Sequence, residues 1–141
     1  MIVPPPGLLD TDLHSEVMRR NPTVLPEAQR YLGIHRHFTL SIITRYEILR
    51  GLKARQATAQ EVVFNQFCAV NRIVPLSEAI VERAAEVYAD LHRRGALIGD
   101  ADILIAATAL VEGLVLLTNN ERHFGRVAGL QIANWLRSAG G

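Results

Sequence analysis

The sequence is short of the features that mark secreted or membrane proteins. It has a single cysteine, Cys68, so no disulfide can form within the chain, which is typical of a reducing compartment. No stretch approaches the roughly 20 uninterrupted apolar residues of a membrane span. The N-terminus, MIVPPPGLLDTD, lacks the basic and long apolar regions of a signal peptide. We therefore expect a cytoplasmic protein without a membrane association.

An excess of charge of one sign is also missing. The chain has 15 basic and 14 acidic residues, so its net charge of +1 provides no overall attraction to a polyanion. Only Lys53 is a lysine and the other 14 basic residues are arginines, which make bidentate contacts with phosphates. Codon usage in GC-rich DNA would produce the same bias. The charge pattern therefore permits nucleic-acid binding without demonstrating it.

Length and composition favour one globular domain over residues 1–141. The sequence is 49% hydrophobic and 21% charged, and a chain of this size buries roughly 70% of its unfolded surface. Strands are predicted at residues 7–12, 35–41, 71–76, 114–118 and 130–135, and helices at 22–34, 41–56, 58–70, 78–95 and 101–113. This alternation predicts an α/β fold, a three-layer α/β/α sandwich with a central, mostly parallel sheet.

Residues that start and stop helices support several of these bounds. Ser41 and Ser77 are expected to cap the helices that follow them. Gly33 and Gly113 are expected to end helices, and Asp100 is a candidate cap for the apolar helix at 101–113.

Acidic and amide side chains stand near the ends of several predicted elements. They are Asp10 and Asp12 after the first strand, Glu47 in the helix that follows the second, Asp100 and Asp102 at the start of the apolar helix, and Asn119 and Asn120 after the strand 114–118. Each one alone has an ordinary structural role as a turn residue, a helix cap or a solvated charge. Parallel sheets bind ligands beyond the carboxyl ends of their strands. We therefore expect these segments to meet at one edge of the sheet.

Crowded carboxylates favour a bound cation. Without one, neighbouring carboxylates raise one another's pKa values. Oxygen ligands without cysteine or clustered histidine favour Mg²⁺ or Mn²⁺ over Zn²⁺. Because Mg²⁺ keeps several waters and is completed by substrate phosphates, the expected chemistry is on a phosphate ester.

These residues lie in a pattern that resembles a known family. The stretches that carry the likeness are LLDTD at 8–12, SIITRYEILRG at 41–51, IGDADILIAATAL at 98–110 and LLTNNERHFGRVAGLQIANW at 116–135. In this order and spacing they resemble the PIN-domain ribonucleases, specifically the VapC-like toxins of bacterial toxin–antitoxin pairs.

The resemblance implies a catalytic set and a metal-binding set. The catalytic set would be Asp10, Glu47, Asp102 and Asn120. The first three would hold the metal ion, with Asp100 as a supplementary ligand. Many relatives have aspartate where Asn120 stands, so the site has one charge fewer and the binding of a second metal ion is left open. Further candidates are Thr11 and Thr118 for positioning water or phosphate, and Arg45, Arg50, Arg122 and Arg126 for binding RNA.

The activity implied by the resemblance is Mg²⁺- or Mn²⁺-dependent hydrolysis of RNA phosphodiester bonds, with 5′-phosphate and 3′-hydroxyl products. It also implies a homodimer and a small VapB-like antitoxin that blocks the acidic groove. The sequence differs from the family's usual pattern at two places. The prolines at 4–6 shorten the first strand, and His123 stands where relatives often have an acid. Neither is expected to touch an essential position.

Other classes of function remain as alternatives. The D-x-D of LLDTDLH is also found in haloacid-dehalogenase-type phosphatases, but these need a lysine late in the chain and only Lys53 is present. A metal-independent ribonuclease would use histidines such as His35 and His37 and would ignore chelators. A non-catalytic PIN-like module that binds RNA or a protein is the third alternative.

Overall fold

The structure, a computed structural model, describes residues 3–137. Its strands are β1 (Gly7–Leu9), β2 (Thr39–Ser41), β3 (Arg72–Val74), β4 (Val115–Leu117) and β5 (Ile132–Ala133). Its helices are α1 (Thr11–Met18), α2 (Leu25–His35), α3 (Ile42–Ala54), α4 (Thr58–Ala69), α5 (Glu78–Arg93), α6 (Asp100–Glu112) and α7 (Glu121–Phe124). Among the described residues no helix is both long and apolar enough to cross a bilayer.

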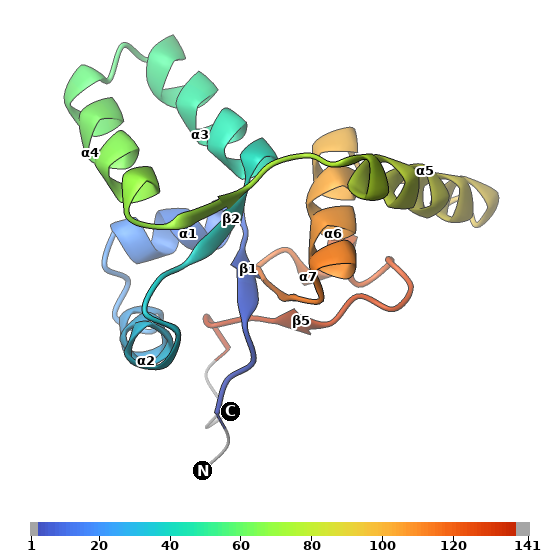
Figure 1. The fold of residues 1–141 in the computed structure, drawn as a ribbon, viewed down its shortest axis with the longest axis horizontal. Coiled ribbons are helices and arrows are strands. Elements are labelled where there is room, and N and C mark those ends of the chain that lie inside the picture. The colour runs from blue at the N-terminus through green and yellow to red at the C-terminus, as the bar shows by residue number, and fades with distance from the viewer. Residues whose placement is uncertain (1–2, 138–141) are drawn as a thin grey trace.

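The strands form parallel ladders, as expected for strands joined through helices. β4 pairs with β1 on one side and with β5 on the other. β2 and β3 form a second parallel ladder, and β2 lies beside β1. Figure 1 shows α1 to α4 on one side of β1 and α5 to α7 on the other. The predicted α/β class with a parallel central sheet is confirmed.

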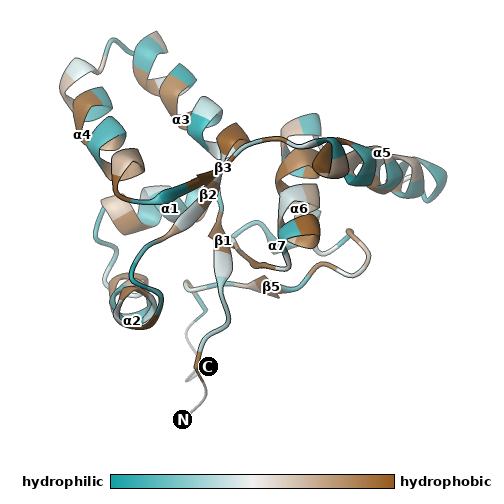
Figure 2. Ribbon diagram, in the orientation of Figure 1, coloured by the Kyte–Doolittle hydropathy of each residue, from teal (hydrophilic) through white to brown (hydrophobic). Residues whose placement is uncertain are grey.

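Alternating side chains on the paired strands build the two cores of this arrangement. Leu8 and its partner Leu116 face a cluster formed with α5, α6 and α7. Leu9 and its partner Leu117 face a second cluster formed with α1 and α2. Because successive side chains of a strand point to opposite faces, two adjacent leucines on each strand serve both layers. Figure 2 shows brown segments in β1 and in α6 at the centre of the molecule.

Several predicted helix ends are confirmed. The Ser41 hydroxyl accepts a hydrogen bond from the Ile43 N–H at 3.0 Å, and the Ser77 hydroxyl accepts one from the Ile80 N–H at 3.2 Å. Gly113 ends α6 in the left-handed conformation, with a φ of 67°. Glycine has no Cβ to disfavour this conformation, and its N–H bonds back to the last turn of the helix.

Other predicted bounds were wrong. Gly33 does not end α2, which continues to His35 and stops at Arg36 with a φ of 73°. His35 therefore belongs to a helix, and the strand predicted from residue 35 is confined to Thr39–Ser41. Asp100 is not a cap: Gly99 occupies the cap position and Asp100 is the first helical residue of α6.

Two helices were missed. The strand predicted at residues 7–12 ends at Leu9, and α1 begins at Thr11 because the Asp10 carboxylate accepts a hydrogen bond from the Thr11 N–H at 2.7 Å. Such a cap satisfies a free N–H at the start of the helix. The other missed helix, α7, has 4 residues, which is too short to show a helical periodicity.

Gly7 leaves no room for a side chain. A Cβ at this position would lie 2.7 Å from Cγ and Cδ1 of Leu117, which is buried in the core under α1 and α2. We predict that Gly7→Ala lowers the free energy of unfolding by about 1–3 kcal/mol, because Leu117 must leave its packed position. Urea denaturation measures this change.

Gly33 provides the matched control. It lies within α2, and a Cβ there would meet no atom within 4 Å. Gly33→Ala is therefore expected to raise the free energy of unfolding by about 0.5–1 kcal/mol, through helix propensity alone. Equal effects of the two substitutions would contradict the packing argument.

Candidate active site

Asp10 is the buried centre of the acidic residues. It follows β1, and its N–H donates to the Leu117 carbonyl at 2.9 Å, which extends the pairing of β1 with β4. Thr118 follows β4, so the parallel register places its hydroxyl beside Asp10. The hydroxyl donates to Asp10 Oδ2 at 2.8 Å, while Oδ1 accepts from the Thr11 N–H. Asp10 is only 5% exposed.

A second carboxylate crowds this one. Asp12 Oδ1 lies 3.4 Å from both the Thr118 hydroxyl and the Asn119 N–H. The hydroxyl has one proton, and its shorter contact is with Asp10. Burial, together with the negative charge of Asp12, raises the pKa of Asp10 from an ordinary 3.8 to about 7. Nearby positive charge would allow Asp10 to ionise at neutral pH.

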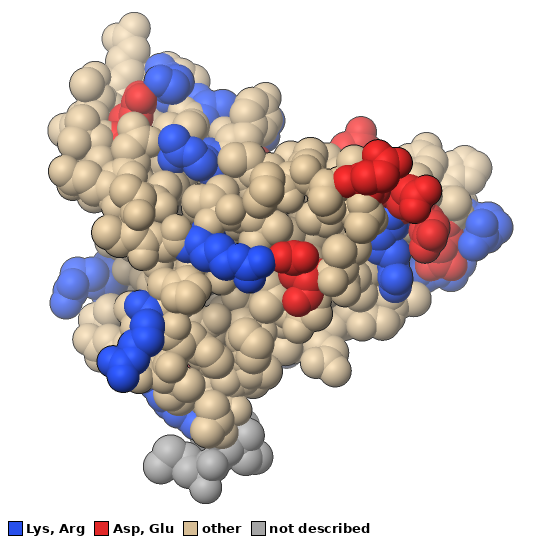
Figure 3. Space-filling view, viewed as in Figure 1, with Lys and Arg blue, Asp and Glu red and all other residues tan. Residues whose placement is uncertain are grey.

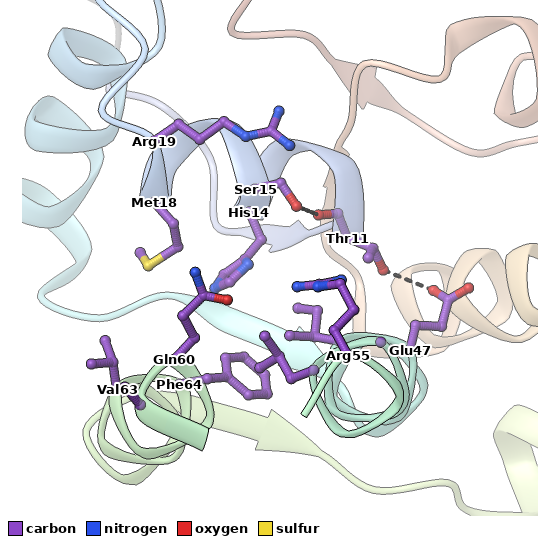
Figure 4. Close-up of a pocket in the computed structure, with 14 residues that line it drawn as sticks. Thr11, His14, Ser15, Met18, Arg19, Glu47, Arg55, Gln60, Val63 and Phe64 are labelled. Atoms are coloured by element: carbon purple, nitrogen blue, oxygen red, sulfur yellow. Dashed lines mark hydrogen bonds between the residues drawn. The ribbon is translucent and has the colours of Figure 1, made fainter. Parts of the chain in front are cut away.

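Glu47 reaches the site through Thr11. The Thr11 hydroxyl donates to Glu47 Oε1 at 2.8 Å (Figure 4), and it also lies 3.3 Å from the Thr44 hydroxyl. Thr11 starts α1 and Glu47 lies in α3. The cap at Asp10 and the hydrogen bond from Thr11 thus bring Glu47, which lies 36 positions after Thr11, to the same edge of the sheet.

Asp102 and Asn120 are joined to the site by His123. The Asn120 N–H donates to the Thr118 hydroxyl at 2.9 Å. His123 Nδ1 lies 3.1 Å from Asn120 Nδ2 and 3.4 Å from Asp102 Oδ2. A protonated Nδ1 donates to Asp102, whereas an unprotonated Nδ1 accepts from the Asn120 amide. His123 thus contacts two residues of the predicted catalytic set, which the sequence did not lead us to expect.

These contacts form one continuous chain, which we call the acidic network. Its members are Glu47, Thr11, Asp10, Thr118, Asn120, His123 and Asp102. The network contains all four residues of the predicted catalytic set and both predicted threonines. Asp100 is exposed at the first position of α6, and within residues 3–137 no hydrogen bond joins it to the network.

The four candidate arginines have different surroundings. Arg45 donates to Asn65 at 3.1 Å and lies over the Phe64 ring, so it packs against α4. Arg126 donates to the Leu97 carbonyl at 3.1 Å. Arg50 is exposed over the Tyr46 ring, 3.8 Å from Glu47, and Arg122 is exposed after Asn120 and Glu121.

Basic side chains are scattered over one face of the molecule rather than gathered in a patch. On the face drawn in Figure 3, acidic side chains gather over α5, whereas basic side chains stand apart from one another. Basic residues form no continuous stripe on this face. Attraction of a polyanion would therefore depend on local contacts beside the site.

The donor atoms of the network suit a hard divalent cation. Asp10, Glu47 and Asp102 offer carboxylate oxygens, and burial together with Asp12 raises the pKa of Asp10 in spite of its hydrogen bonds from Thr118 and Thr11. Within residues 3–137, no three acidic, histidine or cysteine side chains converge closely enough to enclose a metal ion. The site therefore offers suitable oxygen donors. The side chains of Asp10, Glu47 and Asp102 would have to rotate for their carboxylates to reach one ion together.

The chain combines a parallel α/β fold with a buried Asp10 and two half-buried carboxylates, Glu47 and Asp102, at the carboxyl edge of its strands. In parallel α/β folds this edge is where ligands bind. Residues 8–130 match the PIN domain family. The chain therefore belongs to the PIN-domain family.

Curated relatives share much of the chain. Ribonuclease VapC1 of Methanocaldococcus jannaschii is 40% identical over 95 residues, which cover 66% of this chain and 68% of that protein. Ribonuclease VapC2 of Haemophilus influenzae is 32% identical, over 92% of this chain and 97% of its own length.

Solved structures share the fold. A DNA-bound VapBC from Salmonella typhimurium matches with a TM-score of 0.82 and 26% identity, over 94% of this chain and 99% of that chain. FitAcB from Neisseria gonorrhoeae matches with a TM-score of 0.80 and 26% identity, over 93% of this chain and 99% of that chain.

The raised pKa of Asp10 predicts a pH-dependent stability. Between about pH 4 and 7 the folded protein keeps a proton on Asp10 that the unfolded chain releases, so stability falls as the pH rises through this window. Asp10→Asn removes the ionisation. We predict that it raises the free energy of unfolding of the metal-free protein by about 2–4 kcal/mol at pH 8, with little change at pH 4.

The measurement is urea denaturation with chelator at both pH values. Asp90→Asn is the control, because the hydrogen bond from Arg94 lowers the pKa of Asp90. Its removal is expected to bring no gain in stability at pH 8. A gain from Asp10→Asn that is the same at pH 4 and pH 8 would refute the electrostatic explanation.

Proposed function

We propose that this protein is a Mg²⁺- or Mn²⁺-dependent endoribonuclease and the toxin of a toxin–antitoxin pair. The observation that carries the proposal is the buried Asp10 carboxylate, crowded by Asp12 and joined through the acidic network to Glu47 and Asp102. Membership of the PIN-domain family supports it, and so do the relatives that are named ribonucleases VapC.

In this proposal the carboxylates of Asp10, Glu47 and Asp102 would hold the cation, with Asp100 as a supplementary ligand from the exposed start of α6. The chemistry that such a cation would supply is activation of water and stabilisation of the leaving oxygen. Thr118 orients Asp10 and Thr11 orients Glu47, each by a hydrogen bond of 2.8 Å. Outer partners of this kind fix the direction of metal ligands.

Asn120 and His123 complete the site on the side of Asp102. The amide at Asn120 adds no negative charge, so the set carries one charge fewer than a site with four acids. His123 contacts both Asp102 and Asn120 and thereby limits how the Asp102 carboxylate turns. We propose Arg50 and Arg122 for holding flanking phosphates, because both are exposed near network residues. Arg45 and Arg126 are weaker candidates, since protein groups already engage their guanidinium groups.

We further propose that the protein acts in the cytoplasm, as a homodimer, and that a VapB-like antitoxin encoded beside it blocks the acidic site. Matched structures of VapBC from Salmonella typhimurium and FitAcB from Neisseria gonorrhoeae support the antitoxin. The absence of a bilayer-spanning helix from the described part of the chain is compatible with the proposed location.

A non-catalytic PIN-like binding module is the alternative that a specific observation favours. Asn120 stands where an acid would strengthen metal binding, and residues 3–137 contain no closed group of three ligands. The phosphatase alternative is not supported, because Lys53 forms an ion pair with Glu61 at 2.8 Å, and over residues 3–137 no hydrogen bond or ion pair joins it to the acidic network.

Cleavage of a total RNA pool tests the proposal. We expect Mn²⁺ or Mg²⁺ to support cutting, with 5′-phosphates at the new ends, and we expect excess chelator to abolish it. Asp102→Asn removes a proposed metal ligand and should reduce the rate by about 100-fold or more. Asp90→Asn, in α5, is the control and should cut at the wild-type rate.

Other outcomes separate the alternatives. Cutting that survives chelator would move the chemistry to histidines. Folded protein that binds RNA in the presence of Mn²⁺ but never cuts it would support the binding module. Sequencing of the cut ends measures cutting, and calorimetric titration of the protein with RNA in Mn²⁺ measures binding.

A further inference from the structure

His123 is held beside Asp102 by a short, anchored helix. It lies in α7, and the next residue, Phe124, is fully buried in the core formed with α5 and α6. The N–H of Gly125 closes the turn by donating to the Glu121 carbonyl at 2.8 Å. The backbone that carries His123 therefore has a fixed position next to the first turn of α6.

The imidazole Nδ1 of His123 lies where donor atoms of two other side chains gather. It is 3.4 Å from Asp102 Oδ2 and 3.1 Å from Asn120 Nδ2. A half-turn of the amide exchanges Nδ2 for Oδ1, so that three possible ligand atoms face one another. Neighbouring ligands of an octahedral ion, each about 2.1 Å from it, lie about 3 Å apart. The spacing around His123 is thus close to that of ligands on one ion.

No single position of the imidazole proton satisfies both contacts. When Nδ1 accepts from the Asn120 amide, its lone pair also faces the negative oxygen of Asp102. When Nδ1 is protonated and donates to Asp102, it faces the hydrogens of the amide instead. A cation removes this conflict, because the carboxylate oxygen, the imidazole nitrogen and the turned amide oxygen all direct lone pairs at it.

The other ring nitrogen is compatible with this role. The His123 side chain is 43% exposed, and over residues 3–137 no hydrogen bond engages its Nε2 atom. When Nδ1 offers its lone pair to an ion, the ring proton is on Nε2 and donates to water. The ring therefore ligates an ion without leaving a buried polar group unsatisfied.

We propose that His123 Nδ1 is a ligand of the bound cation and that this nitrogen makes the site select Mn²⁺ over Mg²⁺, an inference that rests on the proposed metal-dependent function. Mg²⁺ prefers oxygen ligands and gives up its waters reluctantly. Imidazole instead binds first-row transition metals. A nitrogen ligand beside the carboxylates therefore strengthens the binding of Mn²⁺ more than that of Mg²⁺.

A ligand differs in a measurable way from a side chain that only orients Asp102. In the orienting role, His123 acts on every cation that this carboxylate binds, so its removal weakens Mn²⁺ and Mg²⁺ binding by the same factor. A nitrogen ligand discriminates between the two ions, so its removal changes the ratio of their affinities.

Two substitutions of His123 separate these roles. His123→Asn keeps an amide near the position of Nδ1, which still forms a hydrogen bond with Asp102 but lacks the imidazole nitrogen. His123→Asp supplies a carboxylate, a ligand that suits Mg²⁺. His37→Asn is the matched control, because His37 is exposed between α2 and β2.

Calorimetric titration of the metal-free protein with MnCl₂, and separately with MgCl₂, measures the two affinities. We expect the wild type and His37→Asn to bind Mn²⁺ about tenfold more tightly than Mg²⁺, or better. His123→Asn should lose about tenfold in Mn²⁺ affinity and less than about threefold in Mg²⁺ affinity. His123→Asp should bind Mg²⁺ more tightly than the wild type does.

Pulsed electron paramagnetic resonance of bound Mn²⁺ provides a direct readout, because it detects a nitrogen that coordinates the ion. We expect a nitrogen coupling in the wild type and in His37→Asn that is absent from His123→Asn and His123→Asp. A coupling that persists in His123→Asn would overturn the ligand role. Equal losses of Mn²⁺ and Mg²⁺ affinity in that variant would overturn it too, in favour of orientation alone.

Neither readout needs RNA cutting, so the two proposals can fail separately. If the wild type never cuts RNA but shows a nitrogen coupling that His123→Asn lacks, the ribonuclease proposal fails and the ligand role stands. Metal-dependent cutting by a wild type without nitrogen coupling would give the opposite result. Folded protein that binds neither ion would overturn both.

Discussion

The parallel register of β1 and β4 is the constraint on which the site depends. Because Leu9 pairs with Leu117, the residues that follow the two strands, Asp10 and Thr118, lie side by side although 108 positions separate them. The hydroxyl of Thr118 then connects Asp10 to Asn120, and through His123 to Asp102. A shift of one residue in this register would turn Leu9 and Leu117 away from their core and would separate the carboxylate from its donor.

Burial gives this arrangement its chemical character. Asp10 is held by two hydrogen bonds, but it lies away from water and beside Asp12, so its pKa rises to about 7. The protein thus maintains a carboxylate whose ionisation is costly unless a cation compensates it. A cation bound there, as proposed, would couple folding to ion binding, since it would relieve an unfavourable interaction that exists only in the folded chain. A groove that begins at Thr11 and Glu47 extends the same edge of the molecule and adds an apolar surface next to the charged one.

Some elements were predictable because their signals are local. Ser41 and Ser77 cap the helices expected to follow them, and Gly113 ends α6. The apolar run of α6 required a central buried position, which it has. The predictions failed where a local pattern was ambiguous. Asp10 could end a strand or cap a helix, and the short strand before it offered no periodicity to decide. His35 and His37 precede residues that favour strands, yet His35 completes α2 and its Nε2 lies 2.7 Å from the Pro4 carbonyl.

Residue types and their spacing therefore determined which groups stand near the carboxyl ends of the strands, because apolar runs, caps and acids are readable from neighbours in the chain. Only the tertiary structure decided that His123 joins Asp102 to Asn120, that Arg45 and Arg126 are engaged by protein groups, and that His14 lines a groove. The reason is that each of these contacts joins segments that are distant in sequence. The pKa of Asp10 likewise depends on the exclusion of water by elements from both halves of the chain, which no local pattern records.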